Sequence, residues 1–227
     1  MAELRDLSGR TALVTGSATG LGRSIALKLA ERGAEVIINC SRSVADAEAT
    51  VSDCQALGAQ ARLVQADVAT EAGCQTLARA AGASGRLDIL VNNAGITRHA
   101  RDHSDLNALS KDDFLDTYAV NVVGPFLMVQ ACRDLLVASH EQTGRAAAVL
   151  NVSSIAGVTG IGSSVAYAAT KGALNTMTLS LARALAPAIR VNAVCPGFIG
   201  TRWFKDRMDE EQYKRMEVGI AASVPLN

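Results

Sequence analysis

The segment Thr11–Cys40, TALVTGSATGLGRSIALKLAERGAEVIINC, decides the fold. Its two ends are short apolar runs without polar alternation, which is typical of parallel strands that are covered on both faces. Between these runs, Leu21, Ile25 and Leu29 recur at helical spacing, and Gly33 stands where a helix is expected to end. The segment is therefore a strand–helix–strand unit, the repeating element of a parallel sheet.

Three glycines form the loop between this first strand and the helix. Gly16, Gly20 and Gly22 are spaced as GxxxGxG, which differs from the GxGxxG of the usual dinucleotide fingerprint. Glycine permits a sharp turn and a close approach of the backbone to a ligand, and the free N–H groups of a helix N-terminus favour an anion. A purely structural turn is the alternative. The position between a strand and a helix favours a pyrophosphate site.

Apolar runs alternate with helical patterns along the rest of the chain. The predicted strands are Thr11–Thr15, Glu35–Asn39, Ala61–Ala66, Leu87–Asn92, Ala146–Val152 and Arg190–Cys195. The chain has 227 residues and shows neither a linker nor an internal repeat. The sequence thus predicts one α/β domain over residues 1–227, a Rossmann-type doubly wound parallel sheet with helices on both faces.

Capping signals place several helices. Val44, Ala47, Val51 and Cys54 form a helical stripe that Gly58 closes. Ser110 followed by Asp113 resembles a capping box that opens a long helix, and Pro125 within this helix is expected to bend or loosen it. A further helix is expected over Ser163–Ala186, before Pro187.

Composition argues against several classes of protein. The 22 Lys and Arg balance the 22 Asp and Glu, which leaves no net field to attract nucleic acid or an anionic membrane. No uninterrupted apolar run approaches the length of a membrane span, and the start of the chain does not resemble a signal peptide. The five cysteines are scattered without a CxxC pair, so neither disulfides nor a metal site is expected. A reducing, cytoplasmic location is expected for the same reason.

The end of the second strand bears on cofactor choice. An NAD-type site places a carboxylate there for the ribose hydroxyls, whereas this chain has Cys40, Ser41 and Arg42. Arg42 is able to pair with a 2′-phosphate, or it is a solvated surface arginine. The sequence therefore predicts a preference for NADP(H), with NAD(H) as a possible cofactor.

Tyr167 and Lys171 lie four residues apart in a predicted helix and so share one face. A phenol titrates near pH 10, and lowering its pKa by about three units requires about 4 kcal/mol. An ammonium group beside it and a positively charged nicotinamide are able to supply this energy. A lone YxxxK match is common on solvated helices, so the pair alone identifies no chemistry.

Further motifs occur with this pair in one order along the chain. They are NNAG at Asn92–Gly95, Asn121 in YAVNVVG, Ser154 thirteen residues before Tyr167, and PG at Pro196–Gly197. In this combination the chain, from Leu7 to about Thr201, resembles the short-chain dehydrogenase/reductase family, most of all its 3-oxoacyl-[acyl-carrier-protein] reductase and sugar or alcohol dehydrogenase branches. The family binds NAD or NADP and moves a hydride between the nicotinamide and a carbonyl or secondary alcohol.

The resemblance implies four catalytic residues. Tyr167 would be the general acid/base, and Lys171 would hold the nicotinamide ribose and lower the pKa of the tyrosine. Ser154 would orient the carbonyl, and Asn121 would anchor a water that passes protons to solvent. The alternatives are structural, since Ser154 is able to cap a turn and Asn121 to satisfy backbone groups.

The resemblance also implies a set of cofactor contacts. They are Gly16, Ser17, Thr19, Gly20, Leu21 and Gly22 at the pyrophosphate, Ser41 and Arg42 at the ribose, Asp67 and Val68 at the adenine, Asn93, Ala94 and Gly95 at the sheet centre, and Tyr167, Lys171, Pro196, Gly197, Ile199 and Thr201 toward the nicotinamide. Asp67 has a structural alternative as the start of the next turn.

Two segments belong to the expected substrate side. His99 and His103 are interpreted as part of a polar loop rather than as metal ligands, because no further ligands are evident. The segment 201–216 resembles the family's lid helix, with Trp203, Phe204 and Met208 facing the substrate, or else it is an ordinary surface helix. The resemblance implies a further helix and a final strand that the sequence does not contain, so the chain is truncated, partly ordered or without that edge. If the chain ends at Asn227, the edge strand 190–195 is expected to stay unpaired on one side.

The favoured function is an NAD(P)-dependent oxidoreductase acting on a small carbonyl or alcohol substrate, as a homo-oligomer. A catalytically silent dinucleotide sensor of the same fold is the alternative. Retention of Asn121, Ser154, Tyr167 and Lys171 favours the enzyme. A nucleic-acid-binding or scaffold protein is disfavoured by the zero net charge.

Overall fold

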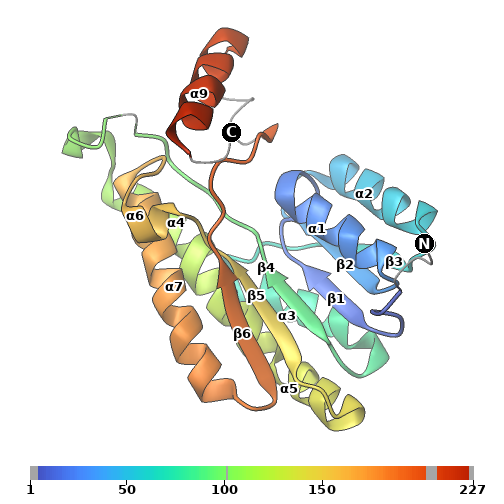
Figure 1. The fold of residues 1–227 in the computed structure, drawn as a ribbon. Helices are drawn as coiled ribbons and strands as arrows, with labels where there is room; N and C mark the ends of the chain where they lie inside the picture. Colours follow the sequence, from blue (N-terminus) through green and yellow to red (C-terminus); the bar gives the residue numbers. More distant parts are fainter. Residues whose placement is uncertain (1–4, 101, 203–208, 225–227) are drawn as a thin grey trace.

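The computed structural model describes residues 5–100, 102–202 and 209–224. Its centre is a parallel sheet of six strands in the order β3-β2-β1-β4-β5-β6 (Figure 1). The strands are β1 (Thr11–Val14), β2 (Glu35–Cys40), β3 (Ala61–Gln65), β4 (Ile89–Asn92), β5 (Ala147–Val152) and β6 (Ile189–Val194). Every predicted strand is present, with ends shifted by one or two residues. The order reverses between β1 and β4, which is where doubly wound sheets open a crevice for a ligand.

Helices cover both faces of the sheet, as predicted. α1 (Gly20–Glu31) and α2 (Val44–Ala56) lie on one face, and α3 (Glu71–Ala81), α5 (Gly124–Thr143) and α7 (Val165–Leu185) lie on the other (Figure 1). The shorter elements are η1 (Gly82–Ser84), η2 (Leu106–Ala108), α4 (Lys111–Tyr118), η3 (Ala119–Val123) and α6 (Ala156–Thr159), and α9 (Glu210–Ser223) comes last.

The two layers of core follow from the alternation of side chains along the strands. In β1, Val14 packs toward α1 and α2, whereas Leu13 packs toward α3 and α5. On α1 the innermost positions are small residues, including Ala26 and Ala30, and the predicted apolar stripe beside them is only partly buried. Small residues let the helix approach the sheet closely, which explains how a chain with 4% aromatic residues builds a dense core.

The predicted irregularity at Pro125 is a π-helical turn. The capping box of Ser110 and Asp113 is present, and α4 runs directly into the π-helical η3, which contains Asn121. Because residue 125 is proline, it has no N–H to donate to the carbonyl of Asn121 four residues earlier. The wider turn accommodates this loss, and α5 then begins at Gly124 with its proline in the first turn, where proline is tolerated.

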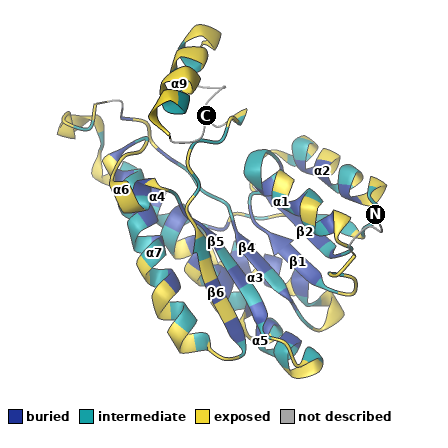
Figure 2. Ribbon diagram, in the orientation of Figure 1, coloured by how far each residue is buried: buried dark blue, intermediate teal, exposed yellow. Residues whose placement is uncertain are grey.

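The helical run Lys111–Thr143 is long and apolar enough, by length and composition alone, to cross a membrane. Its inner residues Met128, Cys132 and Leu136 are buried in the core that α5 shares with the sheet and α3. Figure 2 shows β1 and β4, at the centre of this sheet, as largely buried. The run is accordingly the core helix of this α/β domain.

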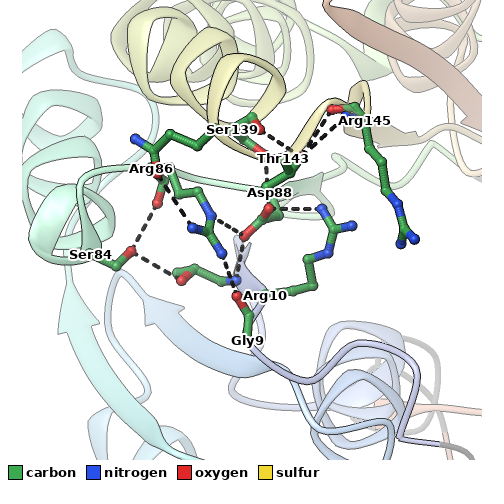
Figure 3. A network of polar contacts seen from close by, with 10 residues as sticks. Gly9, Arg10, Ser84, Arg86, Asp88, Ser139, Thr143 and Arg145 are labelled. Atoms are coloured by element: carbon green, nitrogen blue, oxygen red, sulfur yellow. Dashed lines mark hydrogen bonds and ion pairs between the residues drawn. The ribbon is translucent and has the colours of Figure 1, made fainter.

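A buried carboxylate joins β1, β4 and α5 at the end of the sheet away from the strands' carboxyl termini (Figure 3). Asp88 accepts hydrogen bonds from the backbone N–H of Thr11 at 2.8 Å, from the hydroxyl of Ser139 at 2.8 Å and from Arg10 at 3.0 Å. Arg86 adds a longer ion pair at 3.4 Å. This network fixes β1 beside β4, so the two strands deliver their following loops to the same place at the other end.

The helix α9 stands apart from the two layers, beyond the carboxyl ends of the strands (Figure 1). None of its described residues is buried. It begins at Glu210, later than the segment predicted from the sequence, and Trp203, Phe204 and Met208 lie outside the described residues.

Candidate active site

The carboxyl ends of the strands open into one cleft of about 1350 Å³. Its walls come from the glycine loop, the ends of β2 and β3, the segments after β4, β5 and β6, and one face of α9. All the residues predicted to bind the dinucleotide or to act in catalysis line this cleft, except Ser17 and Asn121. These two are fully buried behind its walls.

The glycine loop has the geometry that its sequence predicts. Gly16 and Gly20 adopt φ angles of 60° and 59°, in the left-handed region that glycine tolerates best. A Cβ atom on Gly22 would lie 2.4 Å from the carbonyl oxygen of Gly16. Within the described chain, Thr19 makes no side-chain capping bond to α1, and the first turn of α1 has no acidic residue. The first N–H groups of α1 thus face the cleft without a competing side-chain anion.

Side-chain hydrogen bonds from Asn93 and Ser17 fix the backbone of the glycine loop. The side-chain amide of Asn93 donates to the carbonyl groups of Thr15 and Gly16 at 2.9 and 3.0 Å. The Ser17 hydroxyl donates to Val14, so it supports the loop from inside the protein. Its assignment as a cofactor contact stays a prediction.

Ser154, Tyr167 and Lys171 converge at the centre of the cleft. Ser164 caps α7 by accepting a hydrogen bond from the backbone N–H of Tyr167 at 3.1 Å, which fixes the start of the helix. The Ser154 hydroxyl, at the end of β5, hydrogen-bonds the Tyr167 phenol. One turn further along α7, Nζ of Lys171 lies 5.5 Å from the centroid of the Tyr167 ring and donates to the carbonyl of Val152 at 2.8 Å.

Burial dominates the electrostatics of this group. It raises the pKa of the Tyr167 phenol, and the hydrogen bond from Ser154 only partly opposes the rise. Burial lowers the pKa of Lys171 to about 8, against a smaller opposing effect of Cys195. In the protein alone, desolvation thus outweighs the Ser154 hydrogen bond, and the lowering expected from Lys171 together with a bound nicotinamide stays a prediction. A protonated phenol is the form that donates a proton to a substrate oxygen.

Asn121 supports the segment that follows β4. Its Oδ1 accepts from the N–H of Ile96 at 2.8 Å, and its Nδ2 donates to the carbonyl of Ile96 at 2.9 Å and to the hydroxyl of Thr170 at 3.1 Å. The side chain thus satisfies backbone groups, as the structural alternative predicted, but these belong to Ile96 and not to the expected segment beside Gly124 and Pro125.

Asp67, shortly after β3, both lines the cleft and stabilises the turn that follows it. Its side chain is exposed and lines the cleft, and its Oδ1 also accepts from the N–H of Ala69 at 2.9 Å. Ser41 and Arg42 line the cleft after β2. Arg202 also lines it, and forms an ion pair with Asp46 at 3.2 Å, a contact that the sequence analysis did not find.

Another part of the cleft wall combines apolar and basic side chains. Ile155, Ile161, Phe198, Met216 and Ile220 provide the apolar surface, and Arg98, His99 and Arg215 provide the basic groups. His103 does not line the cleft, and its Nε2 lies 3.0 Å from the carbonyl of Gly162. His99 lines the cleft and His103 does not, and the assignment of their loop to the substrate side stays a prediction.

One cleft contains a glycine loop at a helix N-terminus and a Ser–Tyr–Lys group, and it opens where the strand order reverses between β1 and β4. This combination is typical of dinucleotide-dependent oxidoreductases. Residues 10–212 match the short chain dehydrogenase family. The chain therefore belongs to the short-chain dehydrogenase/reductase family, whose members bind a nicotinamide cofactor and catalyse oxidation or reduction.

Several relatives are similar over most of the chain. A putative ketoacyl reductase 2 of the granaticin polyketide synthase from Streptomyces violaceoruber is 42% identical, over 85% of this chain and 74% of the relative. An L-rhamnose 1-dehydrogenase (NAD(P)(+)) from a Sphingomonas species is 36% identical, over 93% of this chain and 81% of the relative. Among solved structures, an NADP active-site complex of Pseudomonas aeruginosa RhlG has a TM-score of 0.86 and 33% identity, over 99% of this chain and 85% of that one.

Proposed function

We propose that the protein is an NADP(H)-dependent reductase of a ketone or 3-oxoacyl compound, which also oxidises the corresponding secondary alcohol. The convergence of Ser154, Tyr167 and Lys171 beside the glycine-loop cleft supports this proposal most directly. The similarity to a ketoacyl reductase favours a 3-oxoacyl substrate, and the similarity to a sugar dehydrogenase extends the class to hydroxylated ketones.

A nicotinamide dinucleotide held in the cleft would supply or accept the hydride. Ser154 hydrogen-bonds the substrate carbonyl and holds it against the phenol of Tyr167. Tyr167 then donates its proton to the oxygen as negative charge develops there, and its raised pKa keeps that proton available at neutral pH. Lys171 holds the nicotinamide ribose and stabilises the phenolate that results, and Asn121 positions the water that returns a proton.

Replacing Tyr167 with Phe tests this mechanism. The variant keeps the ring but loses the proton donor, so turnover with a panel of ketones and 3-oxoacyl thioesters should fall by several orders of magnitude. The affinity for NADPH, measured by its fluorescence, should change by less than about threefold because the phenol serves proton transfer. Turnover within tenfold of wild type would contradict the role of Tyr167. A wild-type protein that binds the dinucleotide but reduces nothing in the panel would instead support the silent sensor.

The preference for NADP(H) rests on Arg42 and Ser41 at the ribose end of the cleft. A 2′-phosphate would accept charge-assisted hydrogen bonds there, each worth about 1.5–3 kcal/mol if shielded from solvent. Arg42 is exposed, so we expect NADPH to bind better than NADH by a factor on the order of tens rather than thousands. Arg42→Ala should remove most of this ratio in competing titrations. Equal affinities in the wild type would show that Arg42 is only a surface charge.

We further propose a cytoplasmic homo-oligomer, a dimer or tetramer, without nucleic-acid or membrane partners. Exposed apolar side chains on three neighbouring helices support association, namely Leu115 on α4, Phe126 on α5 and Leu179 on α7. Light scattering after size exclusion measures the assembly. A monomer at micromolar concentration would contradict the proposal.

A further inference from the structure

Asn39 lies near the end of β2, directly after the apolar run Val36–Ile38, and it is 2% exposed. Its side-chain Oδ1 accepts a hydrogen bond from the backbone N–H of Gly16 at 3.0 Å. Its Nδ2 donates to the carbonyl groups of Ala66 at 3.0 Å, Val64 at 3.2 Å and Cys40 at 3.3 Å. One buried amide is thus bonded to three separate segments of the chain.

Those three segments form the adenosine end of the cleft. Gly16 opens the glycine loop, Cys40 directly precedes the Ser41–Arg42 pair, and Ala66 directly precedes Asp67. The backbone of Asn39 adds two bonds to the loop, because its carbonyl accepts from Ser17 N–H at 2.9 Å and its N–H donates to the Ser17 hydroxyl at 3.0 Å. Movement of Asn39 would therefore disturb the expected pyrophosphate, ribose and adenine contacts together.

We propose that Asn39 is a positioning residue for the adenosine half of the nicotinamide dinucleotide. Only a carboxamide presents an acceptor toward the glycine loop and two N–H donors toward the β2 and β3 carbonyls from one short side chain. Gly16 has a left-handed backbone at φ 60°, and its N–H is directed by this single acceptor. The inference rests on the proposed dinucleotide binding and adds a residue that acts through other residues, since its side chain is used up by protein contacts.

Asn39→Asp is the most informative variant. It keeps the size of the side chain and the acceptor for Gly16, but it turns a carboxylate oxygen toward three carbonyl oxygens. At pH 8 we expect the dissociation constant for NADPH to rise at least tenfold, while kcat at saturating NADPH stays within threefold. As the pH falls toward 5.5, protonation of the buried carboxyl restores one donor, and the affinity should recover relative to wild type. Asn39→Ala should lose the same affinity without the recovery.

A fragment and a control separate positioning from stability. Adenosine 2′,5′-bisphosphate contains only the adenosine half, and its affinity should fall by the same factor as that of NADPH. Ser139→Ala removes a buried hydrogen bond to Asp88 at the opposite end of the sheet, so it should lower the melting temperature with unchanged NADPH affinity. If the Asn39 variants behave like this control, Asn39 is merely structural and the inference is wrong. If wild type binds neither NADPH nor NADH, the proposed function has failed instead.

Discussion

Replacing Asp88 with Ala should destabilise the protein strongly, although Asp88 lies at the end of the sheet away from the cleft. The carboxylate is 1% exposed and joins β1, β4 and α5 through four partners (Figure 3). Its loss leaves the N–H of Thr11 and the hydroxyl of Ser139 buried without an acceptor, at about 1–3 kcal/mol each. Arg10 and Arg86 are partly exposed, so water replaces much of what they lose. The sum is about 2–6 kcal/mol, a range that includes the about 3–5 kcal/mol typical of removing one partner from a buried ionic network.

Reversible urea unfolding, followed by circular dichroism, measures this loss for Asp88→Ala at pH 7. Glu31→Ala serves as the control, because Glu31 forms an exposed ion pair with Lys28 and should cost less than about 1 kcal/mol. Asp88→Asn retains one acceptor and should fall between the two. A loss below about 1.5 kcal/mol for Asp88→Ala would refute the reasoning, since it would show that water satisfies the buried donors.

The pH dependence of the same difference provides an independent check. Burial raises the pKa of Asp88, but the hydrogen bonds from Thr11, Ser139 and Arg10 and the charge of Arg86 outweigh it, so the pKa is lowered. A carboxyl with a lowered folded-state pKa stabilises the protein above its unfolded pKa of about 3.9, and this contribution is lost as the pH falls through the folded-state pKa. The difference between wild type and Asp88→Ala should thus be constant from about pH 5 to pH 8 and shrink below about pH 4.

Two further predictions concern the cleft. In Gly22→Ala the new Cβ would clash with the glycine loop, so the affinity for NADPH should fall more than tenfold. The control Gly219→Ala, whose new Cβ has no non-local neighbour within 4 Å among the described residues, should leave the affinity unchanged. Equal affinities in the two variants would contradict this prediction. Burial lowers the pKa of Lys171 from 10.5 to about 8, so the unfolded chain binds more protons than the folded chain between these pH values. As the pH rises through this range, the stability of the wild type relative to Lys171→Met should therefore increase by up to about 3 kcal/mol. A difference that does not change between pH 7.5 and 10.5 would show that Lys171 is not desolvated.

The features that were predictable from sequence are those that short segments determine by themselves. The glycine loop of β1 and α1, the capping box at Ser110 and the Tyr167–Lys171 spacing each depend on residues within one or two turns. The irregularity at Pro125 was predicted as a bend or a local loosening. Its form as a π-helical turn was not predicted, because this form also depends on how α5 packs on the core.

The features that were missed depend on burial or on distant contacts. The upward shift in the pKa of Tyr167 follows from desolvation by the folded protein, which spacing does not reveal. Arg202 pairs with Asp46 across 156 positions of sequence. Asn39 was missed for the same reason, although a polar residue inside an apolar strand is a signal that the sequence does contain.

The π-helical turn Ala119–Val123 makes this region more sensitive to chain length than to side-chain identity. Each residue advances a helix by about 100°, so deletion of Val122 would restore a regular helix only by rotating α5 about 100° relative to α4. Either the Met128 face would leave the core, or the Asn121 amide would turn away from Ile96. A conservative substitution such as Val122→Ile leaves the phase between the two helices unchanged. Because of the single additional residue in this turn, one continuous helix directs the hydrophobic face of α5 to the core and the Asn121 amide to Ile96.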